Sequence, residues 1–388
     1  MKFLVFVASM AFVLAGCKRP DAPVDQTLSS PEPAAKPEVG GLKVGIILPM
    51  SGPNASFGAA TLDGIKLALE KANAAGDLPD GPLRPVVVDS RSTAEGAAAA
   101  VRELAGSGVI AMIGEVTSES TLAAVAVAAE GTVPFISPGA THADITRAGP
   151  NVFRVCYADP FPGTVMSKFA SSLGVTRAAV LFDPNDPYAM ALVQTFSEDF
   201  VARGGTIVAR ESYDANAPDF RAPLEAIKGR QPEIVFLPAY FTQAATIIRQ
   251  ARPLGLDMPF LGTDGWESAA FLDAAGADAN NSYFASHFSA EEGSESVTTF
   301  VGEFQKVHGR TPEALAALGF DAASFLVHAL RRAGTTEPAA LTAALASTAD
   351  FPGATGTITL DAERNVRKPA IVIRVEEGKF RYLETVEP

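Results

Sequence analysis

The sequence predicts an α/β protein built on parallel β-sheets. Short apolar runs that read as strands alternate with amphipathic runs that read as helices from Leu42 onward. The alternation occurs in two successive sets of similar spacing, and the chain of 388 residues is long for a single hydrophobic core. We therefore expect two Rossmann-like lobes.

The first set begins with an apolar strand, and its first helix carries Leu62, Ile65, Leu69 and Ala72 on one face. An alanine-rich helix follows at Ala94–Leu104. The strands expected in this set are Leu42–Leu48, Pro85–Asp89, Val109–Ile113, Val133–Ile136 and Val152–Val155.

The second set repeats the pattern and then gives way to helices. Its expected strands are Ala178–Phe182, Thr206–Arg210, Glu233–Leu237 and Pro259–Leu261, with helices near Met190–Arg203, Asp219–Lys228 and Gln243–Arg252. Two long helices follow at Glu295–His308 and Pro312–Ala333, then a shorter one at Ala339–Ala346 and an antiparallel section of Gly356–Leu360 and Ala370–Val375. The change predicts three crossings between the lobes, near Ala158, Ala285 and Gly334, which together form a hinge.

Two polar loops follow neighbouring strands in the stretch 109–141. Thr117-Ser118-Glu119-Ser120 opens one helix, and Ser137-Pro138-Gly139-Ala140-Thr141 ends the next strand. Loops at the carboxyl ends of parallel strands are where open α/β proteins bind ligands, and N–H groups at a helix start suit an anion such as a carboxylate. The alternative interpretation is that Ser118 and Thr141 are only helix caps.

The first residues have the pattern of an export signal. Lys2 precedes the apolar run Phe3–Leu14, which is too short to span a bilayer, and Leu14-Ala15-Gly16-Cys17 resembles the bacterial lipobox. We expect residues 1–16 to be removed and Cys17 to carry the lipid anchor that holds the protein at a membrane. Residues 17–41 are rich in proline and poor in large apolar residues, which predicts a disordered tether.

The charge, the cysteines and the histidines of the sequence argue against several classes of function. The formal net charge is −13 and basic residues do not cluster, so nucleic acid is not an expected partner. Cys156 is the only thiol besides Cys17, so we expect it to be free and buried. The four histidines are scattered, and neither a nucleophile elbow nor a phosphate-binding loop occurs. We therefore expect no enzyme activity, no metal and no cofactor.

Several motifs in order resemble those of the leucine/isoleucine/valine-binding proteins, the type I periplasmic solute receptors of ABC importers. They are 45–53 (GIILPMSGP), 112–114 (MIG), 137–141 (SPGAT), Tyr188, 239–240 (AY), 262–265 (GTDG), 319–321 (GFD), 351–353 (FPG) and 356–358 (GTI). The resemblance covers Leu42–Leu383 and implies the type I periplasmic-binding-protein fold, with two lobes and three hinge crossings.

The resemblance also implies a role for individual residues. Ser118 is expected to bind a ligand carboxylate, and Gly139, Ala140 and Thr141 to add backbone groups and a second hydroxyl. Tyr188 and Tyr240 match second-lobe aromatics that close over the ligand, and Asp264 matches the acid that accepts its ammonium group. Phe57 matches an aromatic wall of the side-chain pocket. The full set of expected ligand-binding residues is Phe57, Ser118, Gly139, Ala140, Thr141, Tyr188, Tyr240 and Asp264.

Several of these residues, and two others near them, also have a structural interpretation. Asp264 suits a Thr-Asp-Gly turn, the two tyrosines suit a cleft rim, and Trp266 suits either the core or a lid. Arg154 is expected to form an ion pair between the lobes.

The sequence thus predicts an extracytoplasmic, monomeric lipoprotein that captures a small amino acid, of aliphatic or branched-chain type, and delivers it to an ABC permease. The alternative is a receptor domain of the same fold that acts on a membrane kinase or a cell-wall synthase. The expected first lobe comprises 42–158 plus 286–334, and the second comprises 159–285 plus 335–388.

Overall fold

Two separate β-sheets organise the part of the chain that the structure describes. The structure is a computed structural model, and it describes residues 40–388. The expected signal peptide, Cys17 and nearly all of the tether lie outside these residues. The first sheet is entirely parallel, with strand order β2-β1-β3-β4-β5. Its strands are β1 (Leu42–Leu48), β2 (Leu83–Asp89), β3 (Ala111–Gly114), β4 (Phe135–Ser137) and β5 (Val152–Arg154).

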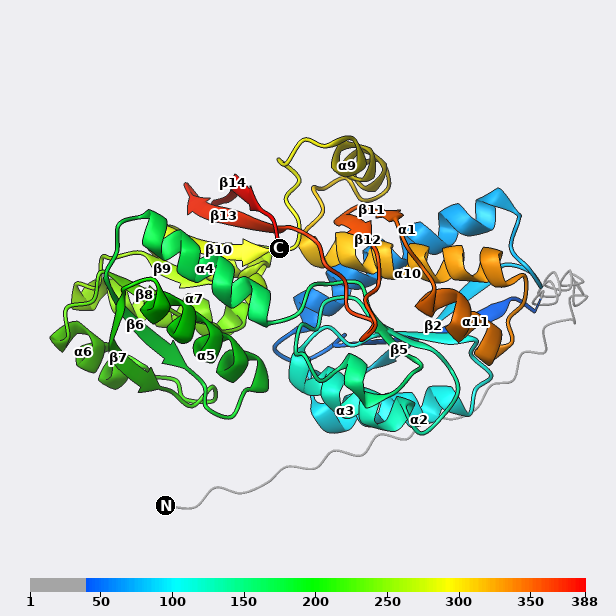
Figure 1. Ribbon diagram of the computed structural model, residues 1–388, viewed down its shortest axis with the longest axis horizontal. Helices are drawn as coiled ribbons and strands as arrows, with labels where there is room; N and C mark the ends of the chain where they lie inside the picture. Colours follow the sequence, from blue (N-terminus) through cyan, green and yellow to red (C-terminus); the bar gives the residue numbers. More distant parts are fainter. Residues whose placement is uncertain (1–39) are drawn as a thin grey trace, which may run out of the picture. The chain divides into compact units, whose positions relative to one another are not determined.

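The second sheet is mixed, with strand order β14-β13-β10-β9-β8-β6-β7. Five of its strands run parallel, and the last two strands of the chain pair antiparallel at one edge, β13 with both β10 and β14 (Figure 1). The strands are β6 (Arg177–Phe182), β7 (Thr206–Ser212), β8 (Ile234–Phe236), β9 (Phe260–Gly262), β10 (Ser282–Ser286), β13 (Ala370–Glu376) and β14 (Lys379–Val386).

The helices fall into two groups, one packed with each sheet. Those of the first group are α1 (Ala55–Ala75), α2 (Ala94–Ala105), α3 (Ser118–Ala128), α9 (Glu295–His308), α10 (Ala314–Ala333) and α11 (Pro338–Ala346). Those of the second group are α4 (Pro160–Ser172), α5 (Pro187–Ala202), α6 (Arg221–Gly229), α7 (Phe241–Ala251) and α8 (Ala269–Ala275). Short 3-10 turns occur at η1 (Thr146–Ala148), η2 (Arg252–Leu254), η3 (Asp264–Trp266) and η4 (Gly276–Ala279). The predicted α/β class is confirmed.

The α1–α10 pair shows how the sequence permits close packing in the first group. The two helices lie side by side (Figure 1). A Cβ atom at Gly64 would lie 1.8 Å from the Ala316 carbonyl oxygen, and one at Gly319 would lie 2.3 Å from the Thr61 carbonyl oxygen. Both glycines are therefore required for the approach of the two backbones. By length and composition α10 is apolar enough to span a membrane, but most of it is buried in this packing.

The chain passes between the two groups at three places. The first passage follows β5 and leads to α4, close to the predicted position at Ala158, and the second follows β10, close to the predicted Ala285. The third passage was predicted near Gly334, but the chain does not cross there. Beyond that residue α11 packs on α10, and β11 (Phe351–Gly353) contacts α10 and pairs with β12 (Gly356–Ile358). The third passage therefore lies between β12 and β13.

This course corrects two expectations. The segment Gly356–Leu360 was predicted to belong to the same antiparallel section as Ala370–Val375, but β12 pairs with β11, and β13 pairs with β10 and β14. The division into two lobes is a proposal, and these contacts place residues 335–358 with the first group. The physical reason is that α11 is apolar and short, and it buries Leu341 and Leu345 in the core that includes α10 residues.

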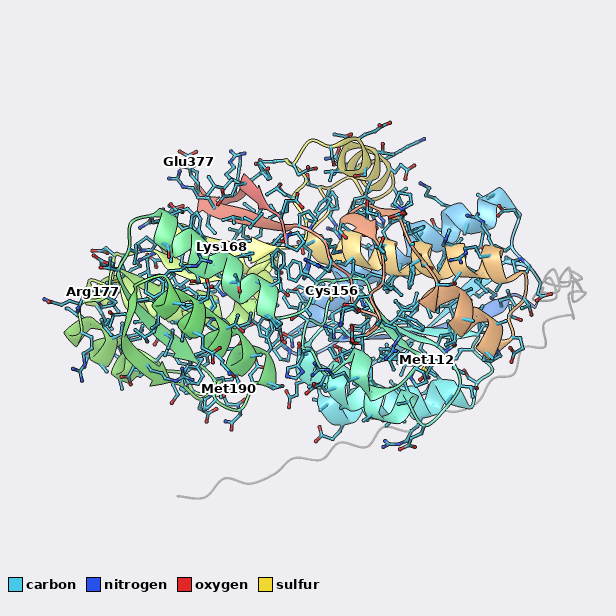
Figure 2. The ribbon with its side chains drawn as sticks, viewed as in Figure 1. Met112, Cys156, Lys168, Arg177, Met190 and Glu377 are labelled. Carbon is cyan, nitrogen blue, oxygen red and sulfur yellow. The ribbon has the colours of Figure 1, made fainter. Side chains whose placement is uncertain are left out.

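Cys156 lies at the first passage, where Figure 2 labels it. Its side chain is buried and free, as predicted, and its thiol donates to the Ala140 carbonyl oxygen at 3.2 Å. Burial raises the pKa of this thiol to about 11. A buried thiol of this kind is structural rather than reactive.

Candidate functional site

The predicted site residues come from the carboxyl ends of strands in both sheets. In the first sheet β3 leads to Ser118, and β4 leads to the loop 138–141. In the second sheet β6 leads toward Tyr188, β8 toward Tyr240 and β9 toward Asp264. Because each strand end is followed by a helix or a 3-10 turn, backbone N–H groups and polar side chains gather at these ends.

Ser118 is buried at the first turn of α3. Its hydroxyl accepts a hydrogen bond from the His142 backbone N–H at 3.3 Å, and its own N–H donates to the Tyr240 hydroxyl at 3.2 Å. Thr117, the N-cap residue, makes no side-chain capping bond. Ser118 is therefore not merely a helix cap, because its hydroxyl joins the two polar loops of the first sheet.

Glu115 fixes the loop before α3. Its Oε2 atom accepts the backbone N–H groups of Val116 and Thr117 at 2.7 and 3.0 Å, and its Oε1 atom accepts the Ser90 hydroxyl at 2.6 Å. Burial raises the pKa of Glu115, whereas these hydrogen bonds act in the opposite direction. Through these hydrogen bonds the buried carboxyl group holds the loop in one conformation.

Arg154 holds the second polar loop. Its Nη1 atom donates to the Thr141 carbonyl oxygen at 2.7 Å, and its Nη2 atom donates to the His142 carbonyl oxygen at 2.7 Å. Longer bonds reach the carbonyl oxygens of Ala140 and Ala143 at 3.3 and 3.4 Å. The prediction of an ion pair between the lobes is wrong. Arg154 is fully buried, and its hydrogen bonds are to loop carbonyls because these acceptors surround the guanidinium group.

Gly139 and Thr141 have different surroundings on this loop. A Cβ atom at Gly139 would lie 2.7 Å from Leu315 Cδ2, so the glycine lets α10 approach the loop. The Thr141 hydroxyl is buried beside the Asp159 carboxyl group, and hydrogen bonding between them lowers the pKa of that carboxyl group, although their geometry falls short of a well-formed bond. A buried hydroxyl without a well-formed hydrogen bond is uncommon and is what a polar ligand would satisfy.

Tyr188 organises the second sheet's side of the site. Its hydroxyl oxygen lies 2.5 Å from Thr263 Oγ1, donates to Asp264 Oδ1 at 3.2 Å and accepts the Gly265 N–H at 3.0 Å. Its ring stacks on Tyr240 at 5.1 Å between centroids, with 15° between the ring planes. Only 1% of Tyr188 is exposed. It is therefore a buried support for the Asp264 turn rather than a rim aromatic.

Asp264 opens the turn η3 and remains partly accessible, since 14% of its side chain is exposed. Its Oδ2 atom lies 3.6 Å from His287 Nε2. Trp266 two residues later is fully buried, and its indole N–H donates to the Leu237 carbonyl oxygen at 3.1 Å. Trp266 belongs to the core, not to a lid, and it anchors the turn that presents Asp264.

The two sides of the site touch each other. Phe57 on α1 packs against Phe241 at 4.9 Å and against Tyr240 at 6.2 Å between ring centroids. The Ser268 hydroxyl lies 3.0 Å from the Ser56 hydroxyl, which joins α8 to α1.

One small cavity lies where the two sides meet. It is lined by Phe57, Val116, Gly139, Tyr240, Asp264, Gly265, Glu267, His287, Ala314 and Leu315. Four of the eight predicted residues line it, and Ser118 and Tyr188 contact the lining residue Tyr240. Its volume is about 20 Å³, room for about one water molecule. A larger guest has to enter while the two sides are apart, and the lining side chains have to move to make room for it.

Three buried polar residues near this cavity were not predicted. Glu267 and His287 line it, and Asp159 lies at the first passage between the groups. Neither carboxylate oxygen of Asp159 makes a well-formed hydrogen bond; burial raises its pKa to about 8, and Asp264 adds to this rise. For two of them the sequence held a usable signal, which is their position next to a predicted feature. Asp159 directly follows the predicted crossing at Ala158, and Glu267 follows the predicted Asp264 turn.

The chemistry of the cavity is that of a binding site for a small polar molecule. Within residues 40–388, no three His, Cys, Asp or Glu side chains are grouped closely enough to hold a metal ion. Hydroxyl and N–H donors lie on the first sheet's side, and a partly accessible carboxyl group lies on the second. Such an arrangement between two α/β sheets is typical of a solute-binding protein.

The comparisons with known proteins agree with this class. The model of the periplasmic binding protein family matches residues 41–379, so the chain belongs to that family. Solved structures similar to this chain include solute-binding proteins of ABC transporters, and the predicted type I fold is confirmed.

Two solved structures and one curated relative illustrate the similarity. The leucine-binding protein LivK of Thermotoga maritima is 30% identical, with a TM-score of 0.86 over 89% of this chain and 99% of that one. The branched-chain amino acid transporter substrate-binding protein LivJ of Streptococcus pneumoniae, in complex with isoleucine, is 32% identical, with a TM-score of 0.85 over 90% and 100%. The Leu/Ile/Val-binding protein homolog 1 of Brucella abortus is 26% identical over 88% of this chain and 93% of its own length.

Proposed function

We propose that this protein captures a small amino acid between its two sheets and delivers it to an ABC importer. One observation carries the proposal: Asp264 lines the same small cavity as Gly139 and Tyr240, and Tyr240 bonds directly to Ser118. An α-amino acid needs donors at its carboxylate and an acceptor at its ammonium group. The two sides of the cavity offer these groups separately.

The carboxylate end is proposed to bind on the first sheet's side. Ser118 and Thr141 would supply hydroxyls, and the loop at Gly139 and Ala140 would supply backbone groups. The Tyr240 hydroxyl already places an oxygen atom 3.2 Å from the Ser118 N–H, which supports an oxygen-binding position there. The Thr141 hydroxyl, which lacks a well-formed hydrogen bond, supports a second polar contact nearby.

The ammonium end is proposed to bind at Asp264, with Tyr188 holding that carboxyl group and Tyr240 closing over the ligand. Phe57, Val116 and Leu315 would contact the ligand's side chain. These walls are apolar, which supports a small aliphatic side chain. The amino acids named for the relatives, leucine, isoleucine and valine, point to the same class.

The cellular setting is proposed from the sequence and the family together. An exported chain lipidated at Cys17 would sit outside the cytoplasm, tethered to a bacterial membrane, and would act as a monomer beside its permease. Palmitate labelling of the chain in cells, with Cys17→Ser as the control, tests the anchor directly.

A thermal-shift screen tests the ligand class. It uses the twenty common amino acids together with benzoate, acetamide and urea. A bound ligand at 100 times its dissociation constant stabilises the protein by ~2.7 kcal/mol, which is readily detected as a shift in melting temperature. We expect shifts with isoleucine, leucine or valine. A shift with benzoate alone would contradict the amino-acid proposal, because benzoate has no ammonium group for Asp264.

A further inference from the structure

Two glutamates form hydrogen bonds between the two sides of the site. These bonds are separate from the contacts proposed for the ligand. Glu267 follows the turn that carries Asp264, and its Oε1 atom accepts the backbone N–H of Ala314 at 2.8 Å. Glu313 precedes α10, and its Oε1 atom accepts the backbone N–H of Ala269 at 3.3 Å. Each carboxyl group therefore reaches across to the backbone of the opposite side.

We propose that Glu267 and Glu313 are positioning residues that clamp the Asp264 turn to the start of α10 and so hold the two sides of the site together. The proposal concerns how the site is kept closed, and its binding consequence rests on the proposed function. Glu267 lines the cavity, but its two oxygens are engaged by the Ala314 N–H and the Ser286 hydroxyl, so it is not expected to bind the ligand's ammonium group.

The Glu267 bond is well placed to stabilise the closed arrangement. Ala314 is the first residue of the 20-residue helix α10, whose leading N–H groups lack partners within the helix. The positive end of the helix dipole favours a carboxyl oxygen at this position. If Glu267 were absent, the buried Ala314 N–H would lose this acceptor, which makes separation of the two sides more favourable.

Glu267 is held in its orientation by its other oxygen. The Ser286 hydroxyl, at the end of β10, donates to Glu267 Oε2. Ser286 also lies at the second passage between the two groups, so the same carboxyl group contacts the passage and the facing helix. Burial raises the pKa of Glu267 to about 8, so near pH 7 it is mainly the neutral acid, whose carbonyl oxygen still accepts the Ala314 N–H.

The link to the ligand is the rigid turn between Asp264 and Glu267. Trp266 is anchored by its bond to Leu237 and by stacking on Phe271 at 5.3 Å, so the turn moves as a unit with the second sheet. A guest that binds Asp264 and the first sheet's loops therefore draws Glu267 toward α10. The clamp and the ligand would both hold the two sides together, with the side chains that line the cavity displaced to make room for the ligand.

Disulfide trapping tests the clamp without any ligand. Ser56 and Ser268 lie on opposite sides with hydroxyl oxygens 3.0 Å apart, so Ser56→Cys with Ser268→Cys forms a disulfide only in the closed arrangement. The full chain carries Cys17→Ser, and the buried Cys156 is left in place. The rate of disulfide formation under a fixed oxidant is compared among variants in this background.

We expect Glu267→Met to slow trapping at least fivefold and Glu313→Met to slow it about twofold. Glu267→Gln keeps an acceptor oxygen and should remain within twofold of the parent. Since Gln and Met both replace the same carboxyl group with an uncharged side chain, the comparison also controls for changes in the reactivity of the neighbouring thiol. Glu337→Met removes a glutamate that accepts the Ala340 N–H within the first group, and it should have no effect.

Isoleucine binding provides the second measurement, on the chain without the added cysteines. Glu267→Met should raise the dissociation rate about tenfold and leave the association rate within threefold, while Glu267→Gln stays near the parent. Unchanged trapping in Glu267→Met would overturn the clamp, whatever isoleucine does. If the parent chain does not bind isoleucine but trapping slows as expected, the clamp stands and the proposed ligand is wrong.

Discussion

The two sides of the site use different chemistry to do complementary work. The first sheet's side consists of neutral donors on two loops. A buried ionisable side chain fixes each loop by hydrogen bonds to its backbone, Glu115 in the first loop and Arg154 in the second. The second sheet's side presents a carboxyl group on one turn, and a stack of two tyrosines supports that turn. One side therefore has many weak contacts, and the other has a single charge.

This difference predicts which substitutions should weaken ligand binding most. A donor on the first side is one of several, so the loss of one leaves others in place. Asp264 is the one acid among the predicted ligand-binding residues, and its position depends on the Tyr188 hydroxyl. The predictions below run from the second side's charge, where the expected effect is largest, to a single hydroxyl on the first side.

Asp264→Ala should weaken amino-acid binding by about 3–5 kcal/mol, because a buried ammonium group would lose its ionic partner. The dissociation constant would rise several hundredfold or more. Isothermal titration calorimetry with isoleucine measures the loss, and Asp273→Ala on the exposed face of α8 serves as the control. A loss below threefold would mean that Asp264 is not the ammonium acceptor.

Asp159→Asn should make the protein more stable at pH 8 by a few kcal/mol and leave its stability at pH 4 nearly unchanged. In the unfolded chain this carboxyl ionises near pH 4, whereas burial raises its pKa in the folded protein to about 8. Between these values the unfolded chain binds fewer protons than the folded protein, so stability falls as the pH rises, and asparagine removes that fall.

Urea unfolding at both pH values measures the effect of Asp159→Asn. The exposed Asp273→Asn variant should show the parent's pH dependence. Equal stability changes at pH 4 and pH 8 would show that the Asp159 carboxyl is not held neutral between the two sides.

Tyr188→Phe tests the support of the second side. It removes the hydroxyl that contacts Thr263, Asp264 and Gly265 while keeping the stacked ring. We expect a loss of about 1–2 kcal/mol in isoleucine binding, seen by calorimetry as a five- to thirtyfold change. Tyr382→Phe removes a surface hydroxyl bond to Thr385 and should bind like the parent. Parent-like binding by Tyr188→Phe would mean that Asp264 is positioned by other contacts.

Ser118→Ala should have the smallest effect, about 1 kcal/mol or roughly fivefold in the dissociation constant, because its backbone N–H and the second loop remain. Ser120→Ala, also buried on α3, is the matched control. If Ser118→Ala cost more than Asp264→Ala, the contrast between a distributed first side and a concentrated second side would be reversed.

Periodicity predicted most of the strands and helices because each βα unit is encoded locally. The error at Gly334 has a physical origin. The helix at 338–346 and the hairpin after it carry no pattern that says which sheet they cover, and that choice depends on the apolar surface left open on α10.

The sequence by itself determined the α/β class, the two sets of strands, the family and the strand ends from which the site residues come. Only the tertiary structure decided that Arg154 braces a loop instead of pairing across the lobes, that Tyr188 supports Asp264 from within the core, and that Asp159, Glu267 and His287 lie buried nearby. The reason is that hydrogen-bond partners and burial depend on residues distant in the chain. Local propensity sets where a strand ends, and packing between the sheets sets what its last residue meets.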